Sequence, residues 1–215
     1  HDDWSHCPGP AMRRLLIFLK YPTPGRVKTR LAKAIGTQAA CDISRACAER
    51  TLERMRTLRD EAVLCVDPPE TMPRTREWVG EEWRLQPQGG GTLGNRLAVA
   101  TGRACSEGAD RVVVIGTDSP WLTSDDVTAA FEALRHHDVV LGPAQDGGYY
   151  LIGLTRPQPA LFEGVAWGTS SVYEQTCARA THLRLTSHSL REGYDVDRLE
   201  DVQRFLEDAK EIRHA

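Results

Sequence analysis

Residues 112–122 read VVVIGTDSPWL, and the fold is decided here. Four β-branched residues in succession predict a buried strand that ends at Ile115, directly before the loop that begins at Gly116. Other short apolar runs occur at residues 15–19, 62–66, 139–141 and 149–154. Helical patterns lie between most of these runs, so the sequence predicts one α/β domain with a largely parallel sheet. Ligands of such sheets bind beyond the carboxyl ends of the strands, and the loops there are where chemistry is expected.

The expected helices are recognised by their apolar spacing and by their caps. They fall at about residues 38–58, 93–106, 124–134, 171–180 and 198–212. Thr92 and either Thr123 or Ser124 are the expected N-caps. Ser171 and Glu174 have the spacing of a capping box. A further short strand is expected at residues 83–85.

Composition limits the class of protein. The chain has 215 residues and a formal net charge of −3, which argues against a generally basic nucleic-acid-binding protein. No apolar run approaches the length of a membrane span. Six scattered cysteines indicate free thiols in a reducing compartment, so a cytoplasmic location is expected. Residues 1–11 are interpreted as an extension or cloning remnant, and residues 12–215 as a single domain.

The loop after the first strand, KYPTPGRVKTRL at residues 20–31, is dense in positive charge. Its cations are Lys20, Arg26, Lys28 and Arg30, beside a turn at Gly25 and ahead of a helix. Cations this close repel one another unless an anion joins them, and phosphate suits both guanidinium groups and helix N-termini. Phosphate binding is therefore predicted, the alternative being a solvated surface loop. The P-loop pattern is absent.

A glycine-rich loop, QGGGTLGNR at residues 88–96, precedes the next expected helix. Glycines such as Gly91 and Gly94 allow the backbone to approach a base, ribose or phosphate closely. Arg96, one turn into the helix, is a further candidate phosphate ligand. A flexible turn is the alternative interpretation of this loop.

Asp118 follows the strand quoted above almost directly. A carboxylate at that place is positioned to hold a hard cation such as Mg²⁺. The alternatives are an Asx-turn or a helix cap, but Thr123 and Ser124 are better placed to cap the helix that follows. Asp118 is therefore the first predicted metal ligand.

Two later loops carry carboxylates as well. The stretch Asp146-Gly147-Gly148-Tyr149 is either a hairpin turn or an acceptor-side loop whose glycines leave room for a substrate. Asp195 and Asp197 share one face of an extended stretch, and Asp197 has capping-box spacing to Glu200. An N-cap carboxylate keeps one oxygen free for another role. Trp167 either lines the acceptor pocket or packs in the core.

Together these loops resemble the DUF2064 family of the nucleotide-diphospho-sugar transferase superfamily over residues 13–206. The motifs that carry the resemblance are K-x-P-x-x-G-R-x-K-T-R-L, G-x-L-G-x-R, G-x-D-S-P-x-L, D-G-G-Y-Y-L-I-G-L and a late D-x-D. The chain is also similar to phospholactate guanylyltransferases. The resemblance implies the glycosyltransferase-A fold, a Rossmann-like three-layer sandwich with a mostly parallel central sheet. By analogy with related cytidylyltransferases it implies Asp197 as a second metal ligand, and Asp195 stays open for that role.

The predicted function is metal-dependent nucleotidyl transfer. An acceptor phosphate attacks the α-phosphorus of a nucleoside triphosphate, and pyrophosphate leaves. The cations of residues 20–30 neutralise the departing charge, with Lys28, Arg30 and Asp118 as the catalytic residues. Asp118 and Asp197 hold Mg²⁺ or Mn²⁺, whereas Gly147, Gly148, Tyr149 and Trp167 contact a small-molecule acceptor. Neither the base nor the acceptor is identified by the sequence, and a monomer and a homodimer are both compatible with it.

Two alternatives remain open. The first is glycosyl transfer from a nucleotide-sugar, in which Asp146 serves as a base toward an acceptor hydroxyl. The Asp-x-Asp motif expected for glycosyl transfer at the end of the central strand is absent, and Thr117-Asp118-Ser119 stands in its place. The second is a nucleotide-binding protein without catalysis. Neither involves a nucleic-acid polymer or a membrane.

Overall fold

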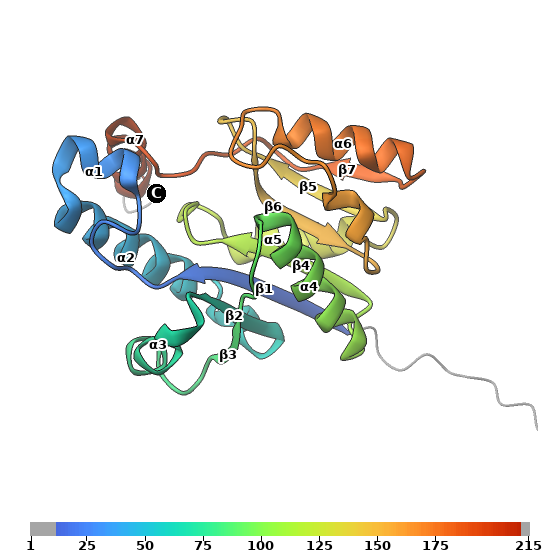
Figure 1. Ribbon diagram of the computed structural model, residues 1–215, viewed down its shortest axis with the longest axis horizontal. Helices are drawn as coiled ribbons and strands as arrows, with labels where there is room; N and C mark the ends of the chain where they lie inside the picture. Colours follow the sequence, from blue (N-terminus) through green and yellow to red (C-terminus); the bar gives the residue numbers. More distant parts are fainter. Residues whose placement is uncertain (1–11, 212–215) are drawn as a thin grey trace, which may run out of the picture.

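The computed structural model describes residues 12–211, and in this range seven strands form one sheet with helices on both faces (Figure 1). The strands are β1 (Arg13–Lys20), β2 (Ala62–Asp67), β3 (Arg84–Pro87), β4 (Arg111–Gly116), β5 (Val139–Pro143), β6 (Tyr149–Leu154) and β7 (Ser187–Ser189). The α-helices are α1 (Thr29–Ile35), α2 (Thr37–Arg54), α3 (Met72–Val79), α4 (Leu93–Ser106), α5 (Ser124–Ala133), α6 (Val172–His182) and α7 (Leu199–Glu211). Residues 1–11, predicted to be an extension, and Ile212, the predicted end of the last helix, lie outside the described range.

The strand order is β3-β2-β1-β4-β6-β5-β7, and β6 is antiparallel to both of its neighbours. The parallel pairs bring their carboxyl ends to one edge, where Lys20 lies opposite Asp67 and Phe18 opposite Gly116. From β1 the chain proceeds to β2 on one side and returns through β4 on the other. The loops after β1 and β4 leave this edge side by side, and a crevice opens there, which is where doubly wound sheets bind ligands.

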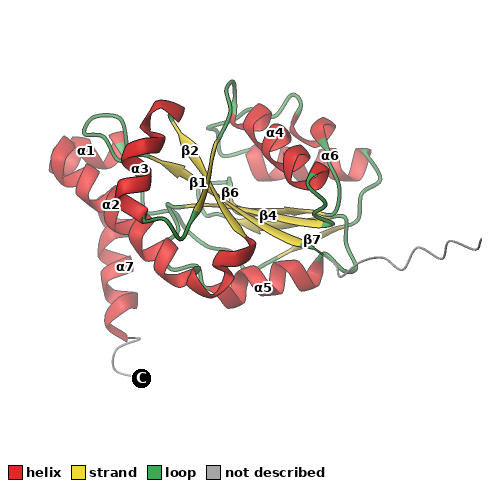
Figure 2. Ribbon diagram, turned by 90° about the horizontal axis from the view of Figure 1, so that it is seen from below, coloured by secondary structure: helices red, strands yellow, loops and turns green. Residues whose placement is uncertain are grey.

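The sheet is the middle layer of three (Figure 2). Alternate residues of β1 serve opposite faces, as expected for a strand covered on both sides. Leu15, Ile17 and Leu19 pack in one cluster with α2 and α5, whereas Leu16 packs in the other with α4 and α6. The predicted α/β sandwich with a mostly parallel sheet is confirmed.

A third apolar cluster lies beyond the carboxyl edge of the sheet and joins the first helices to the last one. It contains Leu31 of α1, Cys47 of α2, Val202 of α7 and Val196 from the segment before α7. This packing carries the chain from β7 across to α7, beside α1 and α2 (Figure 1). The segment of residues 193–197 is thereby fixed at the edge where the crevice opens.

Several local predictions needed correction. The helix expected from residue 38 to 58 ends at Arg54. A separate helix, α1, precedes it, because Gly36 at φ 88° has a backbone conformation that interrupts the helical geometry between the two. Ser171 makes no capping bond to its helix, so the predicted capping box there is wrong. At α7 the backbone N–H groups of Asp197 and Arg198 bond to Asp201, not to Glu200. Helix α3 and strand β7 were not predicted.

The predicted caps of α4 and α5 are confirmed, with Thr92 and Thr123 each forming a reciprocal capping box. Among the described residues, no helix has both the length and the apolar character needed to cross a membrane.

Candidate active site

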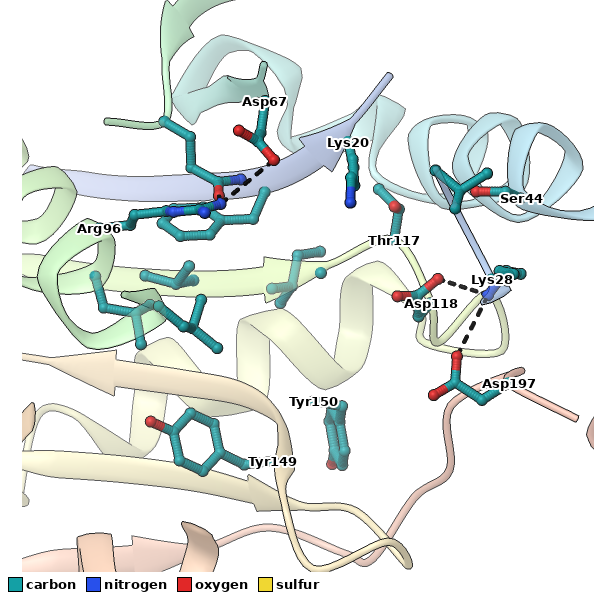
Figure 3. Close-up of a pocket in the computed structure, with 18 of the residues that line it drawn as sticks. Lys20, Lys28, Ser44, Asp67, Arg96, Thr117, Asp118, Tyr149, Tyr150 and Asp197 are labelled. Carbon is teal, nitrogen blue, oxygen red and sulfur yellow. Dashed lines mark hydrogen bonds and ion pairs between the residues drawn. The ribbon is translucent and has the colours of Figure 1, made fainter. Parts of the chain in front are cut away.

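A cavity of about 540 Å³ opens at the crevice between the loops that follow the parallel strands (Figure 3). The predicted site residues that line it are Lys20, Arg26, Lys28, Arg96, Asp118, Tyr149 and Asp197. The predicted residues outside this lining are Gly25, Arg30, Gly91, Gly94, Asp146, Gly147, Gly148 and Trp167. Sequence reasoning missed Asp67, at the end of β2, and Gln88, both of which line the cavity.

The centre of the site is the Lys28 ammonium, which lies between two carboxylates (Figure 3). Its Nζ is 2.6 Å from Asp118 Oδ1 and 3.9 Å from Asp197 Oδ1, and it donates a hydrogen bond to the Val196 carbonyl. The Lys28 side chain is only 3% exposed. Burial disfavours its charge, but the charge of Asp118 and its hydrogen bond to Lys28, with a smaller effect of Asp197, outweigh burial and raise the pKa of Lys28. The ammonium therefore joins three segments that are far apart in the sequence.

The carboxylates around Lys28 carry more negative charge than one ammonium neutralises. Burial, followed by repulsion from Asp118, raises the pKa of Asp195 to about 7, although Ser119 donates a hydrogen bond to it. Burial and Asp118 also raise the pKa of Asp197, against the opposing charges of Lys28 and Arg30. Such shifts report like charges held close together in a partly dry place. The cluster is electrostatically suited to a cation of higher charge than an ammonium.

The segment of residues 193–197 is held in place by contacts that sequence reasoning missed. Val196 N–H donates to the Asp118 carbonyl at 2.8 Å, and Trp121 Nε1–H donates to the Tyr194 carbonyl at 2.6 Å. The Trp121 ring also stacks on Tyr194 and meets Tyr150 edge-on. The loop after β4 thus supplies the Asp118 carboxylate. It also supplies Trp121, whose contacts position the segment that carries Asp195 and Asp197.

The remaining cations of the first loop have no such partners. Among the side chains of residues 12–207, no carboxylate lies at ion-pair distance from Lys20, Arg26 or Arg30. Lys20 and Arg26 line the cavity, whereas Arg30 lies outside its lining yet lowers the pKa of Asp197 through its charge. Unneutralised cations at a concave surface raise the local concentration of anions. The arrangement is suited to phosphate groups.

At the other end of the cavity, Arg96 is engaged by the protein itself (Figure 3). Its guanidinium donates to Gln88 Oε1 at 2.8 Å and to the Gly91 carbonyl at 3.2 Å, and it lies 3.3 Å from Asp67. These bonds tie the glycine-rich loop to the end of β2. Gly94 packs against Trp167, whose ring would be 2.8 Å from an added Cβ, so its missing side chain makes room for that tryptophan.

The predicted acceptor residues lie around the turn between β5 and β6. Asp146 accepts a hydrogen bond from Gly148 N–H, and Gly147, at φ 87°, passes so close to the Ser170 backbone that no Cβ fits there. Their local geometry is that of a hairpin turn packed on the loop before α6. Tyr149 lines the cavity and meets Trp167 edge-on at 6.4 Å.

Comparison with known proteins relates the chain to one family. The family described as "Uncharacterized protein conserved in bacteria (DUF2064)" matches residues 51–169. A crystal structure from Desulfovibrio desulfuricans G20, provisionally named a nucleotide-diphospho-sugar transferase, superposes with a TM-score of 0.83 at 34% identity. That match covers 90% of this chain and 85% of the other.

More distant relatives carry more specific names. A protein of Sphaerobacter thermophilus named phosphoenolpyruvate guanylyltransferase is 26% identical over 179 residues, which are 82% of this chain and 84% of that protein. The structure of 4-diphosphocytidyl-2C-methyl-D-erythritol synthase from Anaerococcus prevotii DSM 20548 matches with a TM-score of 0.57 at 11% identity. It covers 89% of this chain and 95% of the other, and at this identity the likeness concerns the fold.

Proposed function

The chain belongs to the DUF2064 family and is a transferase, and from this premise we propose that it transfers a nucleotidyl group. The donor is a nucleoside triphosphate, the acceptor is a small phosphorylated molecule, and pyrophosphate is released. One observation carries the proposal: Lys20 and Arg26, which have no ion-pair partner among the described side chains, line the same cavity as the carboxylates Asp118 and Asp197. Free cations suit a polyphosphate, and paired carboxylates suit the divalent cation that accompanies it.

The residues present fit a divalent cation. Asp118 and Asp197 offer hard oxygen ligands that already converge on one ammonium. Burial, followed by repulsion from Asp118, raises the pKa values of Asp195 and Asp197, so carboxylates are crowded together at this place. Among the described residues, no group of three or more His, Cys, Asp and Glu side chains is arranged to hold a metal. Two carboxylates are enough for Mg²⁺, which takes its other ligands from water and substrate phosphates. Asp118 and Asp197 are therefore proposed to hold Mg²⁺ or Mn²⁺.

When bound, such an ion polarises phosphate oxygens and offsets their developing charge. The chain's own residues position the reactants and neutralise the leaving group. The acceptor phosphate oxygen attacks the α-phosphorus, the bond from that phosphorus to the bridging oxygen breaks, and the electron pair leaves with pyrophosphate. Lys28 and Arg30 act as catalytic residues, assisted by Lys20 and Arg26. Positioning and electrostatics suffice for this chemistry, so a strong general base is unnecessary.

Nucleotide and acceptor recognition are assigned to different groups of residues around the cavity. The turn at Gly25 presents the phosphate-binding loop, and Gly91 and Gly94 belong to the loop proposed to contact base or ribose. Arg96 keeps that loop in shape through Gln88 and the Gly91 carbonyl. Tyr149 faces the acceptor, with Gly147, Gly148 and Trp167 shaping the wall behind it. Guanosine triphosphate is the first donor to test, since one relative is named a guanylyltransferase.

The proposal is tested by pyrophosphate release. The purified protein is assayed with Mg²⁺, each of the four nucleoside triphosphates and a panel of phosphorylated carboxylic acids. We expect release with one triphosphate in the presence of one acceptor, reduced about a hundredfold or more in Asp118→Asn. Asp60→Asn, at a fully exposed carboxylate, is the matched control and should be unaffected. Release that is unchanged in Asp118→Asn would contradict the assigned role of Asp118.

Glycosyl transfer is the second candidate, favoured by the provisional name of the 34% identical structure. There Asp146 would act as base toward an acceptor hydroxyl, and its carboxylate affects the pKa values of both Asp195 and Asp197. A nucleotide-sugar would be consumed with release of a nucleoside diphosphate, and no pyrophosphate would form. A protein that binds nucleotide and turns over neither donor would be the third outcome.

A further inference from the structure

The Lys28 ammonium has the surroundings of a bound cation. Its contacts are oxygens of Asp118, Asp197 and the Val196 carbonyl, and its side chain is almost completely buried. Carboxylate and carbonyl oxygens are also the ligands that hard divalent cations prefer. The chain's own ammonium therefore stands between the same two carboxylates that the proposed function assigns to the metal.

The backbone at Lys28 is shaped for this position. Lys28 has φ 44° and ψ 49°, a left-handed conformation that costs free energy in any residue other than glycine. The Lys28 side chain lies inward, while the neighbouring Arg26 and Arg30 are exposed. A strained conformation persists only where its surroundings hold it, and the contacts of the ammonium with Asp118, Asp197 and the Val196 carbonyl are part of those surroundings.

We propose that Lys28 is the resident counter-ion of Asp118 and Asp197, that a divalent cation must displace it, and that the displaced ammonium binds the triphosphate. The inference rests on the proposed function, which supplies the triphosphate as the second binding partner of the ammonium. An ammonium and a divalent cation repel each other strongly at a separation of a few ångströms, so both cannot occupy the gap between the carboxylates.

Displacement does not require Lys28 to leave the site. Lys28 lines the same cavity as Lys20 and Arg26, so a rotation of its four-carbon side chain keeps the ammonium within the proposed phosphate-binding region. Phosphate oxygens there would replace the carboxylates that the ammonium gives up. Metal and triphosphate then favour the same rearranged state, and each raises the affinity for the other by the same factor. The metal alone binds weakly, because without triphosphate there is no anion to pair with the displaced Lys28 ammonium.

The test measures Mn²⁺ binding in the absence of nucleotide, by the electron paramagnetic resonance signal of free Mn²⁺. Wild type is compared with Lys28→Met and with Lys28→Gln, which retains a hydrogen-bond donor without the charge. We expect both variants to bind Mn²⁺ about tenfold more tightly or better, because the competing charge is gone. Lys33→Met is the matched control, since it removes one exposed cation from α1, the helix that follows Lys28, and its affinity should change by less than about twofold.

Equal Mn²⁺ affinity in wild type and in the Lys28 variants would overturn the proposal. So would a gain in Lys28→Met that survives the additional change Asp118→Asn, because the metal would then be bound elsewhere. Circular dichroism confirms that each variant is folded. A wild type that binds no nucleoside triphosphate would contradict the proposed function while leaving the Mn²⁺ comparison interpretable, so the two failures are distinguishable.

Discussion

Replacement of Gly193 by alanine tests how the carboxylate-bearing segment is held. An added Cβ would lie 2.0 Å from Trp121 Cζ2 and 2.9 Å from Tyr150 Cε1. The Trp121 ring has little freedom to move away, because its Nε1–H bonds to the Tyr194 carbonyl and its face stacks on Tyr194. Gly193 is itself fixed by hydrogen bonds to Pro143 and Gln145. The Gly193→Ala variant is therefore overpacked, and either the tryptophan or the segment must shift.

Overpacking of a well-filled site costs about 1–3 kcal/mol. For a chain of this size each kcal/mol lowers the melting temperature by about 2–4 °C, so Gly193→Ala should melt about 2–12 °C below wild type. Differential scanning calorimetry measures the shift. Since Asp195 and Asp197 follow in the same segment, affinity for Mn²⁺ with nucleoside triphosphate should also fall.

Gly102→Ala provides the matched control for this prediction. Gly102 lies inside α4 with nothing within 4 Å of an added Cβ, and its φ is not in the left-handed region. Alanine should therefore leave stability unchanged or raise it by up to about 1 kcal/mol. A Gly193→Ala variant that melts at the wild-type temperature would refute the reasoning. So would a Gly102→Ala variant whose melting temperature falls as far as that of Gly193→Ala.

Three further predictions concern charged groups. Burial opposes the charge of Asp126, but hydrogen bonds from Thr123 and Arg191 lower its pKa, so its stabilisation is present at neutral pH and lost as the pH falls through the folded-state pKa. Asp126→Asn should cost about 1 kcal/mol in urea unfolding at pH 7, with a smaller difference from wild type near pH 3. Arg26→Met should weaken triphosphate binding about tenfold in isothermal titration, whereas Arg135→Met, at an exposed pair, should not. Chelation with EDTA should abolish pyrophosphate release, and added Mg²⁺ should restore it; release that persists in EDTA would rule out the metal role.

The architecture was predictable because its signals are local. The run of four β-branched residues after Arg111 predicts a central strand, and Thr92 and Thr123 mark helix starts that the structure confirms. The carboxyl-edge rule then places the loops that carry Lys28 and Asp118 close together. Signals that act over a few residues, together with one rule for parallel sheets, were enough to predict where the crevice lies.

The geometry within the crevice was not predictable from local patterns. The ion pair between Lys28 and Asp118 joins residues 90 positions apart, and nothing near either residue indicates it. The sequence suggested Arg96 as a phosphate ligand, but its guanidinium is engaged by Gln88 and the Gly91 carbonyl of its own loop and by Asp67 at the end of β2. The contact with Asp67 depends on how the glycine-rich loop packs against that strand. Trp121 and Gly193 form a tight contact only once the chain has crossed the sheet edge.

The central claim is that Asp118 and Asp197 hold a metal ion beside a triphosphate, and metal-dependent nucleotide binding tests it most directly. Thermal stability is measured with each of the four nucleoside triphosphates and the common nucleotide-sugars, with and without Mg²⁺. At a hundredfold excess over Kd, a ligand adds about 2.7 kcal/mol of stability. One triphosphate should raise the melting temperature only when Mg²⁺ is present, and Asp118→Asn should abolish that rise. A rise in the melting temperature with a nucleotide-sugar alone, or no rise with any of the nucleotides, would contradict the account.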